Sequence, residues 1–371
     1  MIIGRATCGA YGLRKGLLGG TMDKKKRTSL FRFIYIGATI IAIVLIGVFL
    51  VDVNEMATTF KQLNLTWLLA CIGCLLAYWL TDGILLHDIT SYMYKTEPFL
   101  HSIKVGIIGL YYGALTPFAT GGQPMQVVYM KRRSMPVGTA TCIVSVKFVV
   151  YELSLCALFI AAMAIYGPVF YEEHTAMFWF SLLGFAVNGA AVFFIILTLV
   201  NKRLVVRVGS AFIRFFSKVK IIRNKEKTLE GFGKTIDDYH AAAEYITHHK
   251  LRAIGSFLIS VINLLFFFGL QYFIYRAFVP VGDKSVIDII AIQAFLYVAI
   301  SFAPTPGGAG AAEGGFAAIF AVILAGTGIA VFAPMLFWRF LTYYLMLIVG
   351  SVLVVADEVG TMRRLKRSQG T

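Results

Sequence analysis

Residues 116–126 read TPFATGGQPMQ and interrupt an otherwise apolar part of the chain. The run VGIIGLYYGAL (105–115) precedes them, and the basic triplet KRR follows at 131–133. Proline lacks the backbone N–H that a helix needs, and glycine permits backbone conformations that other residues avoid. The segment therefore predicts a broken helix between an apolar run and a cluster of positive charge.

The composition places this break in a membrane protein. The chain has 371 residues, of which 58% are hydrophobic and 14% charged, which is too apolar for an ordinary soluble domain. Apolar runs of about 20 residues, the length that crosses a ~30 Å hydrocarbon core, recur along it. We therefore predict an all-α polytopic membrane protein.

The net charge of +15 is unevenly distributed, with seven Lys or Arg before residue 31 and twelve in 201–252. Clusters of this kind are typical of loops on the cytoplasmic side of a membrane. The basic surplus therefore indicates orientation and not nucleic-acid binding. It predicts that the N-terminal tail, 1–27, and the C-terminal tail, 358–371, are both cytoplasmic.

The rule that basic segments lie on the cytoplasmic side decides whether residues 99–133 cross the membrane. Spans at 31–52 and 66–87 return the chain to the cytoplasm. If 99–133 crossed the membrane once, the basic triplet and the basic segment 201–250 would both lie outside. We therefore predict that 99–133 is a re-entrant hairpin that enters and leaves by the cytoplasmic face.

The same reasoning predicts a second hairpin at 286–325, which contains APTPGGAGAAEGGF (303–316). It must enter and leave by the outer face, because the basic C-terminal tail follows one further span. Six full spans are expected in all, at 31–52, 66–87, 137–165, 176–200, 252–277 and 330–357.

The two hairpins match under an internal shift. At a shift of 186 residues Leu110-Tyr111 aligns with Leu296-Tyr297, and Gly121-Gly122 aligns with Gly307-Gly308. At a shift of 192 KFVVYE (147–152) aligns with RFLTYY (339–344). We infer inverted repeats over 28–165 and 176–357. Broken helices in corresponding positions of two halves indicate a transporter's binding site, although each break could also be a purely structural kink.

Ionisable residues inside the apolar segments are the main candidates for that site: Asp82, Lys147, Glu152, Glu313 and Arg339. A charge at the bilayer centre costs at least ~2.5–3.5 kcal/mol, so such residues face an internal site or pair together. We predict that the two cations bind an anionic head group, with phosphate as the expected group, and that the three carboxylates hold a cationic part of the substrate or relay protons. The alternative is structural pairing of Lys147 with Glu152 or with Asp82.

The predicted substrate-binding set also contains hairpin-tip residues and two tyrosines: Gly121, Gly122, Gln123, Gly307, Gly308, Tyr151 and Tyr343. The sequence contains no nucleotide-binding P-loop, serine-hydrolase motif or zinc-protease motif. We therefore expect no catalytic residues, no metal and no cofactor.

Residues 202–222 read KRLVVRVGSAFIRFFSKVKII, with apolar residues at helical spacing and Lys or Arg on the remaining surface. This pattern predicts an interfacial helix that rests on an anionic leaflet.

The stretches TPFATGGQPMQVVYM, PTPGGAGAAEGGF and RFLTYYLMLIVG resemble the lysylphosphatidylglycerol synthase transmembrane family, the flippase-like region of the bacterial multiple peptide resistance factor. The resemblance runs from about residue 30 to 357. It implies a lipid flippase in a bacterial cell membrane, with a role in antibiotic resistance. Full-length relatives transfer lysine from lysyl-tRNA to phosphatidylglycerol through a large cytosolic domain. The longest cytosolic segment expected here is too short for such a domain, so we expect no lysyl transfer by this chain alone.

The main functional prediction is therefore a translocator that moves an anionic or aminoacylated phospholipid, similar to lysyl-phosphatidylglycerol, between leaflets. The alternatives are a phosphatidylglycerol lysyltransferase or its membrane subunit, a translocator of polyprenyl-phosphate-linked glycans, and a scaffold for a separate synthase. The expected partners are a phospholipid or polyprenyl-linked substrate and anionic membrane lipids. A separate synthase and a second copy of the chain are further candidates, and nucleic acid is expected only as charged tRNA.

Overall fold

The computed structural model describes residues 63–94, 97–218, 225–247 and 249–369. They belong to one compact unit, Gln62–Thr371. The predicted tail 1–27 and the predicted first span 31–52 lie outside the described residues. Within the described ranges every regular element is a helix, and six helices are long and apolar enough to cross a membrane. The prediction of an all-α polytopic membrane protein is confirmed.

The first half of the described unit contains two long helices separated by a helical hairpin. Helix α3 is followed by the hairpin, whose arms α4 and α5 are joined by the short turn η1, and then by α6. Their bounds are α3 Leu65–Met93, α4 Phe99–Leu115, η1 Pro117–Ala119, α5 Gly122–Lys131 and α6 Val137–Glu173.

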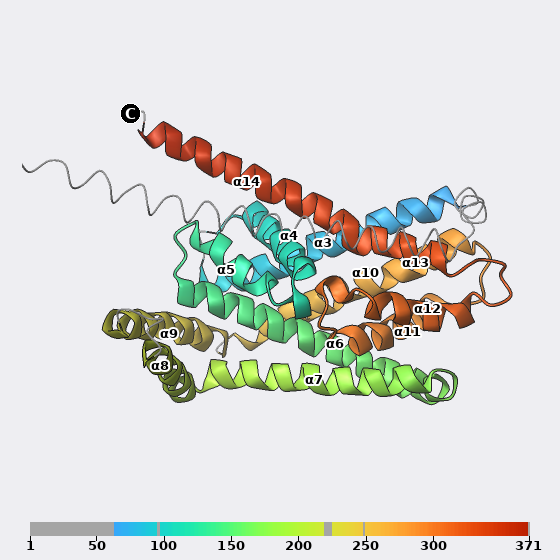
Figure 1. Cartoon of the computed structure of the whole chain (residues 1–371), viewed down its shortest axis with the longest axis horizontal. Coiled ribbons are helices and arrows are strands. Elements are labelled where there is room, and N and C mark those ends of the chain that lie inside the picture. The colour runs from blue at the N-terminus through green and yellow to red at the C-terminus, as the bar shows by residue number, and fades with distance from the viewer. Residues whose placement is uncertain (1–62, 95–96, 219–224, 248, 370–371) are drawn as a thin grey trace, which may run out of the picture. The chain divides into compact units, whose positions relative to one another are not determined.

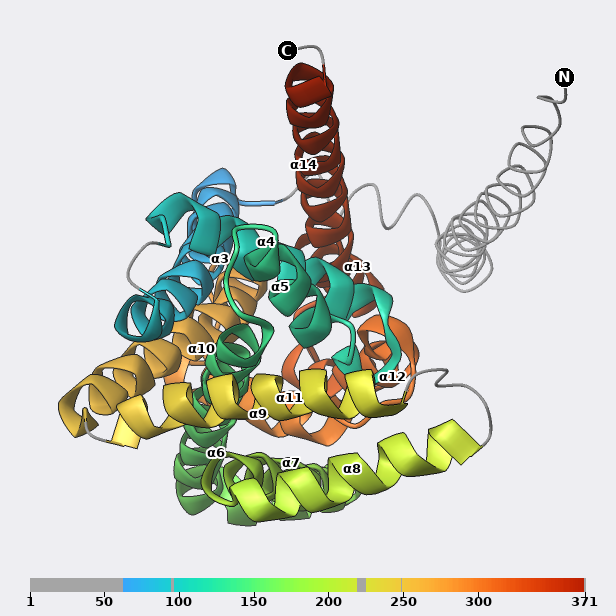
Figure 2. The ribbon, with the colours of Figure 1, turned by 90° about the vertical axis from the view of Figure 1, so that its left-hand side faces the viewer.

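Helix α7 follows α6 directly and runs back alongside it (Figure 1). Two further helices, α8 and α9, then cross the end of the unit (Figure 2). Their bounds are α7 Thr175–Val200, α8 Lys202–Lys218 and α9 Lys225–Thr247. Helix α8 packs on α9, where a Cβ on Gly209 would overlap the ring of Phe232.

The second half repeats the order of the first: a long helix, a hairpin and a long helix. The bounds are α10 Lys250–Phe278, α11 Val286–Ile300, η2 Pro306–Gly308, α12 Ala311–Ile323, α13 Phe332–Arg339, η3 Phe340–Tyr344 and α14 Leu345–Gln369. Element η3 is a π-helical turn that joins α13 to α14. Helix α3 packs along α10, α4 packs against α14, and α6 packs against α11. Each hairpin therefore touches the long helix of the opposite half.

Five of the six helices long enough to span coincide with predicted spans, and the sixth, Pro306–Ile323, belongs to the predicted second hairpin. This segment reaches spanning length only when the turn η2 is counted with α12. Helix α12 itself has 13 residues, about 20 Å at the α-helical rise of ~1.5 Å per residue. Its chain breaks at Gly310, whose φ is 87°.

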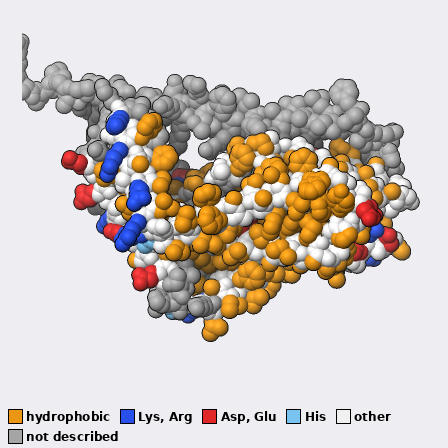
Figure 3. Space-filling model, turned by 90° about the horizontal axis from the view of Figure 1, so that it is seen from below, with side chains coloured by type: hydrophobic (Ala, Val, Ile, Leu, Met, Phe, Trp, Pro, Cys, Tyr) orange, Lys and Arg blue, Asp and Glu red, His pale blue; other side chains and the backbone are white. Residues whose placement is uncertain are grey.

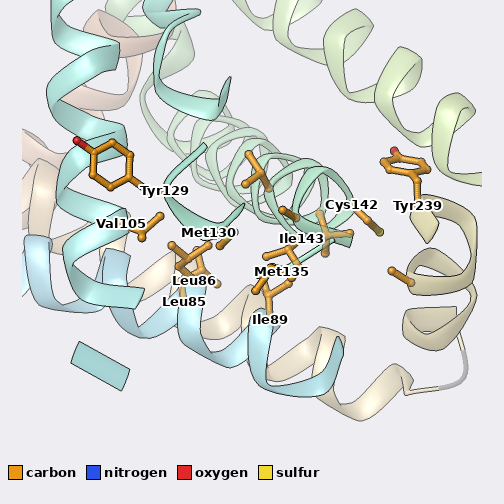
Figure 4. Packing of buried hydrophobic residues seen from close by; sticks show 14 of the residues in the cluster. Leu85, Leu86, Ile89, Val105, Tyr129, Met130, Met135, Cys142, Ile143 and Tyr239 are labelled. Atoms are coloured by element: carbon orange, nitrogen blue, oxygen red, sulfur yellow. The ribbon is translucent and has the colours of Figure 1, made fainter. Parts of the chain in front are cut away.

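A buried apolar cluster fixes the first hairpin in place. Leu85, Leu86 and Ile89 of α3 meet Met130 of α5 and Ile143 of α6, and all five are at most 1% exposed (Figure 4). Burying a large aliphatic side chain contributes roughly 1.5–3 kcal/mol. The base of this hairpin is thus held by helices on several sides.

The outer surface is apolar where lipid is expected. Helix α7 exposes large side chains along its length, including Trp179, Phe180, Leu183 and Phe194. Lys and Arg side chains gather at the end of the unit that carries α8, next to this apolar surface (Figure 3). A contiguous apolar surface of this kind is expected for a protein whose solvent is the bilayer.

The contact of α7 with the second hairpin predicts which glycine is structural. A Cβ on Gly184 would overlap the backbone carbonyl of Val298, whereas a Cβ on Gly189, five residues along the same helix, meets nothing within 4 Å. We expect Gly184→Ala to destabilise the protein by about 1–3 kcal/mol, the usual cost of overpacking.

Thermal unfolding in detergent micelles, followed by tryptophan fluorescence, measures this difference. The matched control Gly189→Ala should unfold at the wild-type temperature or slightly above it, since alanine is the better helix former. Equal melting temperatures for the two variants would contradict the packing of α7 on α11.

Candidate functional site

The two hairpins bend at short segments of matching backbone, here called tip 1 (residues 116–121) and tip 2 (residues 305–310). Thr116 and Thr305 are both extended, with φ/ψ of −119°/146° and −106°/146°. Each is followed by a proline and a single short helical turn, η1 or η2. The two turns touch each other, and η2 also touches α4. The hairpins of the two halves therefore meet at their tips.

The backbone corrects the sequence alignment of the tips. Phe118 and Ala119 have φ of 53° each, and the corresponding left-handed positions in tip 2 are Gly307 and Gly308, with φ of 60° and 65°. The equivalent residues are thus Thr116 and Thr305, 189 positions apart, and the match of Gly121-Gly122 with Gly307-Gly308 was wrong. The sequence comparison paired glycine with glycine, because positive φ is expected at glycine and non-glycine residues rarely adopt it.

Gly121 and Gly122 serve close packing. Gly121 precedes α5 with φ −78°, and a Cβ on Gly122 would lie 2.7 Å from the carbonyl oxygen of Gly109 in α4. The two arms of the first hairpin approach closely for this reason. Gln123, also predicted as a site residue, follows in the first turn of α5 and is partly exposed.

Arg339 binds the backbone of tip 2. Its guanidinium donates hydrogen bonds to the carbonyl oxygens of Gly307 (3.0 Å) and Gly308 (3.5 Å). Its Nε lies 2.7 Å from Oε1 of Glu313, and Arg339 is only 6% exposed. The other oxygen of Glu313 accepts the Gly310 N–H at 2.7 Å. One buried cation therefore neutralises a carboxylate and satisfies carbonyls that the broken helix leaves free.

The aromatic neighbours of Arg339 complete this group. The ring of Tyr343 packs so closely on Gly307 that no side chain fits there. The guanidinium carbon lies 5.1 Å from the ring centre of Trp338 and 5.7 Å from that of Tyr343, within the range of cation–π attraction. Two of the predicted site residues, Arg339 and Tyr343, thus meet at the same tip.

Lys147 forms a second buried ion pair. Its Nζ donates to Oδ1 of Asp82 at 2.7 Å, joining α6 to α3, and the two residues are 8% and 4% exposed. Of the two pairings weighed from the sequence, the structure has the one with Asp82. Residues 147 and 152 are five apart on a helix and do not share a face, which explains why Glu152 is not the partner.

Tyr151 and Glu152 lie one turn beyond Lys147 on α6. The Tyr151 hydroxyl is 2.9 Å from that of Tyr297 on α11. Glu152 is 9% exposed, and its Oε2 has no hydrogen-bond partner within the described part of the chain. Nine of the twelve predicted residues thus form two groups: Glu313, Arg339, Gly307, Gly308 and Tyr343 at tip 2, and Asp82, Lys147, Tyr151 and Glu152 between α3, α6 and α11. The other three, Gly121, Gly122 and Gln123, lie at the start of α5.

Buried amides were not predicted from the sequence. Asn188 of α7 donates to the Ser301 hydroxyl at 3.2 Å, at the end of α11. Asn263 of α10 donates to the carbonyl oxygen of Tyr78 and to the Thr81 hydroxyl, both at 2.8 Å. A single amide side chain within an apolar span, as in FAVNGAAVF (185–193), could have indicated a hydrogen bond between helices, since such groups need partners.

Comparison with known proteins identifies the family. The profile described as the lysylphosphatidylglycerol synthase TM region matches residues 34–350. The chain belongs to this family. It is also 29% identical over 80 residues to a UPF0104 membrane protein of Archaeoglobus fulgidus, a match that covers 21% of this chain and 24% of the archaeal protein.

Ion pairs connect the first hairpin to α14. Asp357 pairs with both Lys104 of α4 and Arg132 at the end of α5, the latter at 2.7 Å, and Arg132 also donates to Glu358 at 2.6 Å. Partial burial acts to lower the pKa of Arg132. The hydrogen bond to Glu358 and the charge of that carboxylate outweigh burial and raise the pKa above its ordinary value. In the sequence, Arg132 indicated only the orientation of the chain in the membrane. Its ion pairs could not be predicted, because the partners lie 225 and 226 residues away.

The role of Arg339 in holding tip 2 predicts a coupling with Glu313. Arg339→Gln removes the cation and leaves a largely buried carboxylate unpaired, which should destabilise the protein by about 3–5 kcal/mol. Adding Glu313→Gln should recover part of that loss, with a coupling energy of about 0.5–3 kcal/mol.

Thermal unfolding of the wild type, the two single variants and the double variant completes the cycle. Losses that simply add would show that Glu313 and Arg339 do not interact.

The ion pairs at α14 predict unequal effects of two neighbouring carboxylates. Asp357→Asn should increase deuterium uptake in residues 128–134, because Asp357 binds two cations and its side chain is 16% exposed. Glu358→Gln should change uptake less, since that side chain is 49% exposed and, among the described residues, forms an ion pair with Arg132 alone, and exposed pairs contribute little. Hydrogen–deuterium exchange with mass spectrometry measures both. A larger effect of Glu358→Gln would overturn this ranking.

Proposed function

We propose that this protein translocates an anionic or aminoacylated phospholipid between leaflets of a bacterial cell membrane. The meeting of tips 1 and 2 supports this most directly. Irregular backbone at membrane depth is tolerated only against protein or a water-filled cavity. In transporters built from repeats, such broken helices lie at the substrate site. The head group would pass between the two halves while the acyl chains stay in lipid.

The lengths of the hairpin arms support re-entry from opposite faces. Helices α4, α5, α11 and α12 have 17, 10, 15 and 13 residues. At ~1.5 Å per residue they are about 15–25 Å long, shorter than a ~30 Å hydrocarbon core. Each arm reaches into the bilayer without crossing it, so the tips would lie within the membrane. The termini and the amphipathic helix α8 would then be cytoplasmic, with α8 against anionic lipids.

The chemistry of the two buried groups fits a phosphate-bearing head group. A guanidinium presents paired donors that match phosphate oxygens, and Arg339 already uses its donors on oxygen acceptors at tip 2. A lipid phosphate would replace Glu313 as the partner of Arg339. The released carboxylate would then be available to an ammonium group, such as that of a lysyl ester. Lys147 and Asp82 offer a second pair that exchanges in the same way.

This proposal predicts leaflet exchange by the purified protein. In proteoliposomes, fluorescently labelled phosphatidylglycerol in the inner leaflet should become accessible to dithionite faster than in protein-free liposomes. Arg339→Ala and Lys147→Ala should slow exchange at least tenfold, as expected when ~1.4 kcal/mol or more of head-group stabilisation is lost. Lys284→Gln, in the exposed loop before α11, is the matched control for loss of one positive charge.

Variants are compared only after they elute as folded protein, at a temperature below the onset of unfolding of each variant. Exchange equal to that of empty liposomes would overturn translocation. A lysyl-transfer product formed with charged tRNA would favour the synthase alternative, which the family's name supports. Competition by unlabelled lysyl-phosphatidylglycerol, or by a polyprenyl phosphate, identifies the preferred head group.

A further inference from the structure

Glu152 is the ionisable residue inside the described spans whose position the ion pairs do not explain. It lies in α6 and is 9% exposed. Its Oε2 is fully buried without a hydrogen-bond partner, and the described residues provide it with no ion pair. Lys147, on the same helix, is already bound to Asp82 at 2.7 Å, and Arg339 is bound to Glu313 at tip 2 at 2.7 Å.

Within the described part of the chain no positively charged side chain forms an ion pair with Glu152, and Lys147, the cation of this region, is bound to Asp82. Groups that interact with Glu152 electrostatically include Tyr151 and Cys156 on α6 and Tyr297 on α11. Helix α3 brings Tyr78 and Asp82 to the same region. Helix α7 and the central part of α10, 263–271, contain no titratable residue. The surroundings therefore consist of hydroxyls, a thiol, aromatic rings and another carboxylate that already has its cation.

An ionised carboxylate in such a place is costly. Removing it from water costs several kcal/mol, and that cost is offset only by a cation or by several hydrogen bonds. A neutral carboxyl needs far less. In the conformation described here the favourable form of Glu152 is therefore the protonated one.

Building on the proposed function, we propose that Glu152 is a proton-binding site that couples lipid translocation to a transmembrane proton gradient. One proton binds Glu152 from the water on one side and leaves it to the water on the other. No other bond forms or breaks. Glu152 lies beside the α6–α11 contact, next to the Tyr151–Tyr297 hydrogen bond. A movement of α11 away from α6 would therefore expose its carboxyl group to water. The charged form is then stabilised by water.

Infrared spectroscopy of the whole protein in lipid nanodiscs tests the protonation of Glu152 without any transport. At neutral pH a protonated carboxyl shows a carbonyl stretching band that is separate from the bands of carboxylates and amides. Glu152→Gln should remove the intensity contributed by one buried carboxyl. The matched control Glu313→Gln removes an ion-paired carboxylate and should leave that band unchanged. A band equally strong in wild type and Glu152→Gln would overturn the proposal.

Transport tests the coupling. With one proton per lipid, a gradient of one pH unit should enrich labelled phosphatidylglycerol up to about tenfold in one leaflet, since one pH unit corresponds to a tenfold ratio. The direction of enrichment distinguishes symport from antiport. Glu152→Gln should give equal amounts in both leaflets at any gradient. Leaflet exchange by the wild type without enrichment would overturn proton coupling and leave translocation standing. Absence of exchange together with a Glu152-dependent infrared band would instead overturn translocation and leave the proton site standing.

Discussion

A broken helix leaves carbonyl oxygens without their usual partners in the helix, and in this protein Arg339 binds two of them. Its contacts with Gly307, Gly308 and Glu313 meet the requirement that buried backbone groups have hydrogen-bond partners. The π-helical turn η3 begins immediately after Arg339. Such turns are frequent at functional sites. The geometry of tip 2, and through it the contact between the two halves, depends on this one side chain.

The first half meets the same requirement by local means. In tip 1 the Thr116 hydroxyl donates to the carbonyl oxygen of Tyr112 at 2.9 Å and accepts the Gly121 N–H at 2.8 Å. The Thr120 hydroxyl donates to the carbonyl oxygen of Pro117 at 3.0 Å. Lys147, which aligns with Arg339 at the predicted shift of 192 residues, pairs instead with Asp82. The two tips have matching backbone but differ in charge, so the proposed anionic head group would act on tip 2 directly and on tip 1 only through its neighbours.

The sequence predicted the order of helices and both interruptions, because apolar run length and the distribution of basic residues are local properties. It failed at the register of the tips, where Phe118 and Ala119 occupy conformations that sequence reasoning reserves for glycine. It also left the partner of Lys147 open. That choice depends on which helix packs beside α6, and Asp82 lies 65 residues away in the chain. The buried charges could be found in the sequence, but their pairing follows from the packing of the helices.

The same packing makes the two ends of the described unit unequal. At one end the base of the first hairpin is tied to α14 by the ion pairs of Asp357 and Glu358. At the other, the base of the second hairpin is tied to α6 by one hydrogen bond, from the Tyr166 hydroxyl to Asp288 at 2.6 Å. Tyr166 and Glu358 are 192 positions apart, the same shift that relates Lys147 to Arg339. A movement that separates α11 from α6 breaks the hydrogen bonds of Tyr166 with Asp288 and of Tyr151 with Tyr297, whereas separating α4 from α14 breaks ion pairs. The conformation described here is therefore held more firmly at the α14 end, and the α6–α11 contact, where Glu152 lies, is the easier one to open.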